Sequence, residues 1–156
     1  MAIREIRKFN DEVLRKACKP VDVVDDHVRK LLDDLADTLY ATPNSAGLAA
    51  NQVGLLRRLV VIDVGEGLMK LVNPEIVEQE GEQVVIEGCL SFPEVWGKVK
   101  RPERVVVRAW NENGEEIIIE SDEELLTKCL CHEIDHLNGQ VFVDKAIGFV
   151  KIDDEE

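Results

Sequence analysis

The stretch SDEELLTKCLCHEIDHLNG, residues 121–139, decides the fold of this chain because it predicts one long central helix. Ser121 followed three residues later by Glu124 has the pattern of a capping box, which favours a helix start near residue 122. Gly139 stands where a C-terminal cap is expected, just after Leu137. Apolar residues cover several faces of this helix, namely Leu125, Leu126, Cys129, Leu130, Ile134 and Leu137. Such broad apolar coverage predicts a helix that is mostly buried.

The same stretch contains an H-E-x-x-H motif at residues 132–136. Residues four apart share one helix face, so the imidazoles of His132 and His136 can reach one metal ion. Glu133 is angularly close enough to face that ion through a water molecule. A metal lowers the pKa of its bound water and polarises a carbonyl, while the glutamate takes the proton. The motif therefore favours metal-assisted hydrolysis over the alternative of two buried, hydrogen-bonded histidines.

A catalytic site of this kind usually has three protein ligands and one open position. Cys89, Glu87 or another carboxylate could supply the third ligand, and Cys89 lies just after the strand-like residues 84–86. Gly88 beside Cys89 would let a thiolate approach an ion closely. The residues by themselves leave the choice open, since Cys89 is equally consistent with a small buried hydrophobe.

Residues 47–52, GLAANQ, form a second candidate segment. Glycine and alanine permit close approach of the backbone to a ligand, and the amide of Gln52 suits a developing oxyanion. A tight contact between helices is the commoner explanation of such small residues.

The remainder of the chain predicts one amphipathic helix over residues 26–40 and a short helix over residues 10–17, ended before Pro20. Five short β-branched runs predict strands at residues 59–62, 69–72, 84–86, 105–107 and 117–119. Turn signals separate these runs: Gly65 and Gly67, Asn73-Pro74, Pro102, and a hairpin signal at Asn113-Gly114. We expect an α+β fold, with short, mainly antiparallel strands in small sheets packed around the central helix.

Length and composition bound the class of protein. The chain has 156 residues, 45% hydrophobic and 33% charged, which fits one globular domain. We expect a single catalytic domain over residues 1–150 and a frayed acidic tail over 151–156. The charged start and the lack of an apolar run of about 20 residues predict a soluble, cytoplasmic protein without a membrane partner. A net charge of −13 argues against direct binding of nucleic acid. Four cysteines in such a chain do not predict a disulfide framework.

Three segments taken together resemble the signature motifs of the peptide deformylase family, in the family's order. They are residues 47–52 (GLAANQ), 87–91 (EGCLS) and 132–136 (HEIDH). Residues 9–11, 14–15, 20–21, 137–139 and 141–144 are also similar to that family. The resemblance runs from near the N-terminus to about Asp144, and the three motifs together are highly specific.

The resemblance implies a role for each motif residue. The metal ligands would be Cys89, His132 and His136, with water in the fourth position. Glu133 would act as the general base and then as the acid. The Gln52 side chain and the Leu90 backbone N–H would stabilise the oxyanion. One divalent ion per chain is implied, with Fe2+ preferred in the cell and Ni2+, Co2+ or Zn2+ as substitutes.

The implied reaction removes the formyl group from the N-terminal formyl-methionine of newly made polypeptides and releases formate. The substrate backbone would lie like an added strand beside Ala46, Gly47 and Gly88. The methionine pocket would be lined by Ile86, Leu125 and Cys129. The resemblance also implies a transient association with the ribosome, but the chain has no room for the long C-terminal helix that some members carry.

Two positions depart from the family's pattern. Ser45 stands where many members have glycine, and some members have a basic residue near the position of Trp96. These departures affect the shape of one loop and the contacts beyond the methionine.

Two other classes of protein carry similar features. A zinc peptidase also uses H-E-x-x-H, but it needs a distal Glu or His ligand and cleaves internal amides. A metal-stabilised binding module needs a fourth protein ligand and a closed site. The segment around Cys89 favours the deformylase interpretation over the peptidase.

Overall fold

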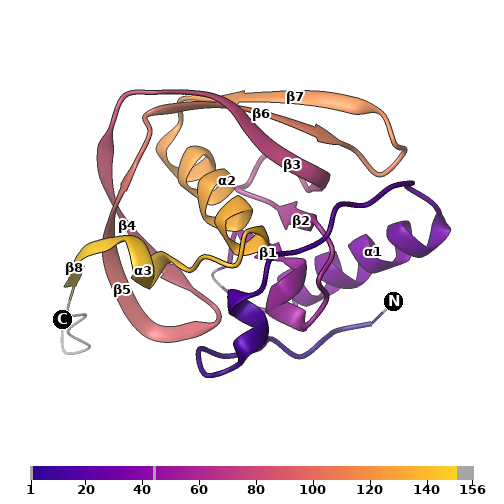
Figure 1. Cartoon of the computed structure of the whole chain (residues 1–156), viewed down its shortest axis with the longest axis horizontal. Coiled ribbons are helices and arrows are strands. Elements are labelled where there is room, and N and C mark those ends of the chain that lie inside the picture. The colour runs from indigo at the N-terminus through magenta and orange to yellow at the C-terminus, as the bar shows by residue number, and fades with distance from the viewer. Residues whose placement is uncertain (1, 44, 151–156) are drawn as a thin grey trace.

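The computed structural model describes residues 2–43 and 45–150, and Figure 1 shows their arrangement around one central helix. That helix, α2, runs over Glu124–Leu137. A five-stranded antiparallel sheet in the order β1-β2-β3-β6-β7 packs on it, with β6 and β7 above α2 in the view and β1 and β2 beside its lower end. Its strands are β1 (Gly47–Ala49), β2 (Leu59–Ile62), β3 (Met69–Glu80), β6 (Arg104–Trp110) and β7 (Glu116–Ser121).

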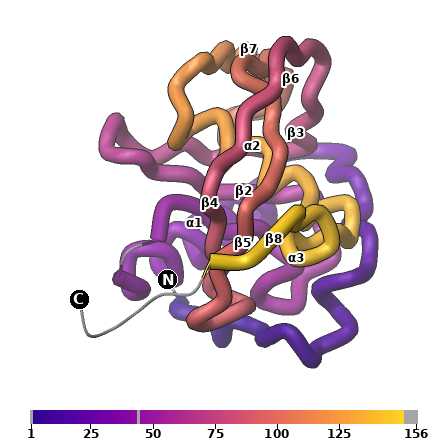
Figure 2. The backbone as a smooth tube through the Cα atoms, turned by 90° about the vertical axis from the view of Figure 1, so that its left-hand side faces the viewer, coloured from indigo at the N-terminus to yellow at the C-terminus, as the bar shows by residue number. Residues whose placement is uncertain are grey.

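A second antiparallel sheet, in the order β4-β5-β8, closes the other side of α2. Its strands are β4 (Gln83–Cys89), β5 (Phe92–Arg101) and β8 (Ala146–Val150). The chain passes from β3 to β4 and from β5 to β6 almost without a break, so two long ribbons bend together from one sheet into the other (Figure 2). The remaining elements are η1 (Glu12–Arg15), α1 (Asp26–Tyr40), η2 (Ala50–Val53) and α3 (Phe142–Lys145). These observations confirm the expected α+β fold.

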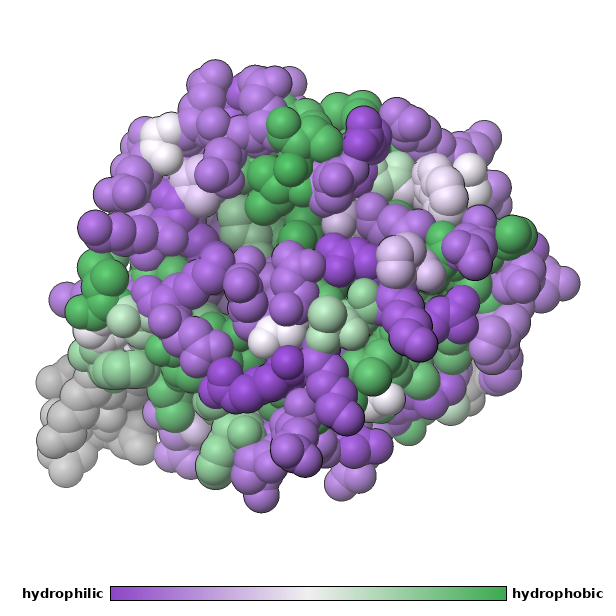
Figure 3. All heavy atoms as spheres, in the orientation of Figure 1, coloured by the Kyte–Doolittle hydropathy of each residue, from purple (hydrophilic) through white to green (hydrophobic). Residues whose placement is uncertain are grey.

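Burial of apolar faces explains where the two larger helices sit. Leu130 and Leu137 of α2 pack against Val60 and Val107 of the five-stranded sheet. On the opposite face, α1 buries Leu32 and Leu35 against β2 residues such as Leu59. Polar residues dominate the surface seen in Figure 3, where apolar side chains form only separate small groups.

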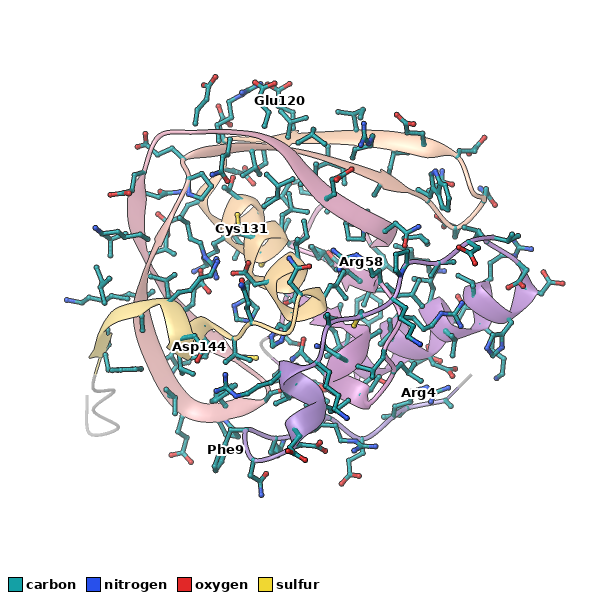
Figure 4. The ribbon with its side chains drawn as sticks, viewed as in Figure 1. Arg4, Phe9, Arg58, Glu120, Cys131 and Asp144 are labelled. Atoms are coloured by element: carbon teal, nitrogen blue, oxygen red, sulfur yellow. The ribbon has the colours of Figure 1, made fainter. Side chains whose placement is uncertain are left out.

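Both ends of α2 are anchored by specific contacts. Gly139 has φ +76° and donates to the carbonyl of His136, which confirms the predicted C-terminal cap. Arg58 lies beside this end of the helix in Figure 4 and donates to the Leu137 carbonyl at 3.2 Å. The predicted capping box is wrong: Ser121 still pairs with Val105 as the last residue of β7, and the N-cap is Glu123, whose side chain makes no capping hydrogen bond. The hydroxyl of Ser121 instead lies 2.8 Å from that of Thr127.

The predicted turn at Asn73-Pro74 is also wrong, because β3 continues through these residues. Asn73 adopts φ +53° at a shift in the β3–β6 register. Its side chain compensates by bonding both the N–H and the carbonyl of Val21 at 2.8 Å. The strand therefore bends at a bulge where the sequence indicated an end.

Other expectations were confirmed with small changes. Helix α1 has the predicted bounds, and Asn113-Gly114 lies in the turn between β6 and β7. The short helix predicted over residues 10–17 is only the four-residue η1, capped by Asp11. Among residues 2–43 and 45–150, none of the helices has the length and apolar content that a bilayer crossing requires. The predicted tail, residues 151–156, lies outside the described residues.

Candidate metal centre

Helix α2 and the end of β4 bring three ligand-type side chains together. The Nε2 atoms of His132 and His136 lie 3.2 Å apart, as expected for residues four apart on one helix face. The Sγ atom of Cys89 lies 3.3 Å from Nε2 of His136. One ligand atom from each of these residues falls within 4.8 Å of the others. The structure thus places Cys89 with the two histidines, at a point where the sequence left Glu87 as an alternative.

Glu87 has a different position, behind His132. Its Oε1 lies 2.8 Å from Nδ1 of His132, and both carboxylate oxygens accept from Arg101. Burial alone would raise the pKa of Glu87, but the hydrogen bonds from Arg101 and His132 outweigh it and lower the pKa to about 2. Glu87 is therefore an anion that orients a histidine, a common arrangement behind metal ligands.

Asp135 extends this buried network. Its Oδ2 accepts from Nη1 of Arg101 at 2.7 Å, and Lys145 approaches the same carboxylate at 3.1 Å. The side chain of Arg101 is only 3% exposed, so its buried positive charge is balanced by the carboxylates of Glu87 and Asp135. Asp135 thus supports a ligand at one remove, through Arg101 and Glu87, and is not merely a solvated charge on the helix.

Glu133 lies on the same helix with its carboxylate buried. Its Oε1 has no hydrogen-bond partner among the described residues. Burial, helped by the nearby charge of Glu87, raises the pKa of Glu133 to about 7 against the attraction of His132. A carboxyl group with a pKa near 7 is well matched to both accepting and donating a proton at neutral pH.

The segment 47–52 packs directly against this centre, and its η2 residues also contact helix α2. A Cβ on Gly47 would lie 2.9 Å from Oε2 of Glu133. Gln52 fixes its amide by accepting from the N–H of Ala49 at 3.0 Å, and its Nε2 lies 3.5 Å from the Cys89 sulfur. Asn51 donates to the His136 carbonyl at 2.5 Å.

A cavity of about 490 Å³ opens in front of these groups. The predicted site residues on its lining are Ala46, Gly47, Gln52, Ile86, Gly88, Cys89, Leu90, Leu125, Cys129, His132 and Glu133. His136 is fully buried beneath it. Trp96 also lines the cavity and covers Gly88, where a Cβ would lie 2.6 Å from the indole ring.

Sequence reasoning missed three residues near this centre. Arg101 belongs to no motif, although one of its carboxylate partners, Glu87, was a candidate ligand and the other, Asp135, lies inside the H-E-x-x-H motif. Asn51 belongs to the quoted segment but was given no role. Lys128 lines the cavity one residue before Cys129, and helix periodicity alone could have placed it there.

The donor set fits a single divalent ion. One thiolate and two imidazoles converge, the described residues add no fourth ligand, and the carboxylate oxygen of Glu133 has no partner. Three protein ligands with an adjacent acid–base group beside an open cavity are the features of a catalytic metal site. Fold and site together define a metal-dependent hydrolase.

Comparison with known proteins narrows this class to one family. A model described as polypeptide deformylase matches residues 3–151. Peptide deformylase from Acetivibrio thermocellus is 62% identical over 100% of this chain and 91% of its own length. The crystal structure of the Thermotoga maritima peptide deformylase superposes with a TM-score of 0.89 at 39% identity, covering 94% of this chain and 99% of that one. A Legionella pneumophila peptide deformylase gives 0.88 at 44% identity, over 92% and 86%.

The chain therefore belongs to the polypeptide deformylase family. As a member it is a metal-dependent hydrolase that acts on an N-formyl amide.

Proposed function

We propose that this chain removes the formyl group from the N-terminal formyl-methionine of new polypeptides, using Cys89, His132 and His136 to hold one divalent ion. The observation that carries the proposal is the convergence of these three ligand atoms beside the buried carboxylate of Glu133. No second function is favoured by a specific observation, because the described residues offer no distal Glu or His ligand to this centre.

Two free sheet edges support the way in which a peptide would bind. β1 is an edge strand of the larger sheet, and β4 is an edge strand of the smaller one. Residues of both edges, including Ala46, Gly47 and Gly88, line the same cavity. An extended peptide between them would receive backbone hydrogen bonds from either side. This arrangement would set the formyl group against Cys89 at the end of β4.

The chemistry follows from the groups around that position. When bound, a divalent ion supplies Lewis-acid polarisation of the formyl carbonyl and a water molecule of lowered pKa. Glu133 takes the proton from the attacking water and then gives it to the departing amine nitrogen. The amide of Gln52 and the backbone N–H of Leu90 stabilise the charge that develops on the carbonyl oxygen.

The first residue of the substrate would enter a pocket between β4 and α2. Ile86, Leu125 and Cys129 form its apolar walls in this proposal, and all three line the cavity. Burial of a methionine side chain there is favourable because it removes apolar surface from water.

We propose Fe2+ as the ion in the cell, with Ni2+, Co2+ or Zn2+ as substitutes. A thiolate beside an open position is accessible to oxygen, and the sulfur itself is oxidisable, so the iron form should be active only when air is excluded.

The site of action would be the cytoplasm, beside the ribosome where formylated chains emerge. Sedimentation of the protein with ribosomes in sucrose gradients tests that association separately from catalysis.

Formate release tests the function itself. We expect anaerobically prepared, iron-loaded protein to convert formyl-Met-Ala-Ser to formate and free peptide, and to leave acetyl-Met-Ala-Ser intact. Gly47 and Gly88 line the cavity where even a Cβ would lie 2.9 Å from Glu133 and 2.6 Å from Trp96. In this proposal the wall therefore leaves little room for the additional methyl group. Mass analysis of the peptide products distinguishes a deformylase from a peptidase. Internal cleavage fragments without formate would show a peptidase and exclude the proposal.

A further inference from the structure

Lys128 bridges helix α2 and the free edge of β4. Its Nζ donates to the carbonyl oxygen of Ile86 at 2.9 Å, across 42 residues of sequence. The side chain is half-buried and lines the cavity together with Leu125, one helical turn earlier, and Cys129. Lys128 therefore belongs to the same wall as the three apolar residues of the proposed first-residue pocket.

The charged residues that line the cavity differ in what they face. They are Lys8, Glu87, Glu94, Lys128 and Glu133. Glu87 is neutralised by Arg101, and Glu133 faces the metal centre. Lys128 is the only cation among them on helix α2, where it lies one turn after Leu125 and next to Cys129. Within residues 2–43 and 45–150, no carboxylate lies within 4.0 Å of its ammonium group.

An ammonium group has three N–H donors, and the Ile86 carbonyl takes one of them. The others are available to a ligand. A purely apolar pocket would leave a polar acceptor of its ligand without a partner, at a cost equivalent to about 5-fold to about 150-fold in affinity. A donor in the wall removes most of that cost.

We propose that Lys128 is a specificity-determining residue that lets the first-residue pocket accept a side chain ending in a neutral hydrogen-bond acceptor. The substrate class is formyl peptides that begin with methionine sulfoxide, which keeps the length of methionine and adds one acceptor oxygen. This inference rests on the proposed deformylation. The reaction is unchanged: water cleaves the formamide, formate leaves, and the sulfoxide remains oxidised.

The test compares two substrates within each enzyme. Formate release is measured for formyl-Met-Ala-Ser and for each sulfoxide epimer of the same peptide, and kcat/KM values are expressed as a ratio. We expect at least one epimer to be hydrolysed within about fivefold of the unoxidised peptide by the nickel-loaded protein. In Lys128→Met, which keeps length without a donor, that ratio should fall at least about tenfold further.

Two more variants distinguish the effect of losing the hydrogen-bond donor from the effects of losing a positive charge or of misfolding. Lys128→Gln keeps an N–H donor, so its ratio should stay within about threefold of the parent. Lys98→Met removes the same charge from the exposed residue opposite Ile86 on β5, outside the cavity lining, and should leave the ratio unchanged. Circular dichroism and metal content verify that each variant is folded and loaded.

The possible results are separable. No formate from the unoxidised peptide would exclude the proposed function. Normal activity on that peptide with a ratio that Lys128→Met does not change would overturn the role of Lys128. A fall in Lys128→Gln as large as in Lys128→Met would overturn the hydrogen-bond basis.

Discussion

Nδ1 of His132 lies 2.8 Å from Oε1 of Glu87, and this contact determines which imidazole nitrogen is free for a metal. Because its hydrogen bonds hold the pKa of Glu87 at about 2, the carboxylate is ionised and accepts a hydrogen bond from the Nδ1–H of His132. The lone pair of His132 is then on Nε2, which converges with Nε2 of His136. A carboxylate from β4 thus sets the tautomer of a ligand on α2.

Neutralising Glu87 is expected to weaken metal binding. Glu87→Gln still reaches His132 but loses the charge that fixes the tautomer and raises the basicity of the ring. Loss of such a partner typically lowers metal affinity or activity about 10–100-fold. Competition with a chelator, followed with nickel-loaded protein, measures the change. Glu82→Gln, an exposed residue just before β4, is the matched control and should bind metal like the parent.

Removing Arg101 is expected to destabilise the fold. Arg101→Met leaves the buried carboxylate of Glu87 without its main partner, a change that typically costs about 3–5 kcal/mol. Urea unfolding of the metal-free protein measures it. Arg104→Met is the control, because Arg104 forms its ion pairs with exposed glutamates on the sheet surface. A similar loss in both variants would show that burial of Arg101 does not matter.

Alkylation is expected to single out Cys89 when the metal is removed. Burial raises the pKa of Cys18 and Cys131 to about 11 and that of Cys129 to about 12, so these thiols hold their protons at pH 8. Cys89 faces the cavity. Iodoacetamide should therefore modify one cysteine per metal-free chain, at Cys89, and none when the metal is bound. Peptide mass mapping locates the label, and equal labelling with and without metal would mean that Cys89 is not a ligand.

The parts of the fold that local sequence predicted well are those with strong periodicity. α1 has both predicted ends because Asp25 caps it and its apolar stripe stops at Leu39. Strand β2 has the predicted bounds because all four residues are buried. All of β5 was missed, because Pro93, Gly97 and several charged residues interrupt its apolar positions. Its partner β4 directly precedes it, but its other partner, β8, lies far along the chain. The predicted turn at Asn73-Pro74 is wrong because the Asn73 side chain bonds the backbone N–H and carbonyl of Val21, which is far away in the sequence. These bonds stabilise a bulge within β3 at that point.

The candidate site, like the fold, was predictable from the sequence only in part. Spacing on one helix was enough to bring His132 and His136 together. Residue physics could not choose between Cys89 and Glu87, which are two positions apart and both reach the centre from β4. Tertiary structure separates them, because Arg101 on β5 draws the Glu87 carboxylate behind His132. No local signal in the sequence reports that pairing.

The close approach of Gly47 to Glu133 gives a test of how tightly the acid–base group is held. An alanine Cβ at residue 47 would lie 2.9 Å from Oε2 of Glu133, so the carboxylate must move. A misplacement of about 1 Å can cost about 10²-fold in rate. We therefore expect Gly47→Ala to keep its metal and fold while kcat for formyl-Met-Ala-Ser falls by about that factor. Gly148→Ala meets no neighbouring atom within 4 Å and serves as the control.

A double variant shows whether this loss acts through Glu133. Glu133→Gln alone should retain the ion and lower kcat by about 10²–10⁴-fold, the usual contribution of a positioned acid–base group. If Gly47 matters because it leaves room for that carboxylate, adding Gly47→Ala to Glu133→Gln should lower kcat little further, since both changes remove the same contribution. Fully multiplicative losses would instead assign the effect of Gly47 to substrate binding along β1, and a rise in KM with an unchanged kcat in Gly47→Ala would point to the same origin.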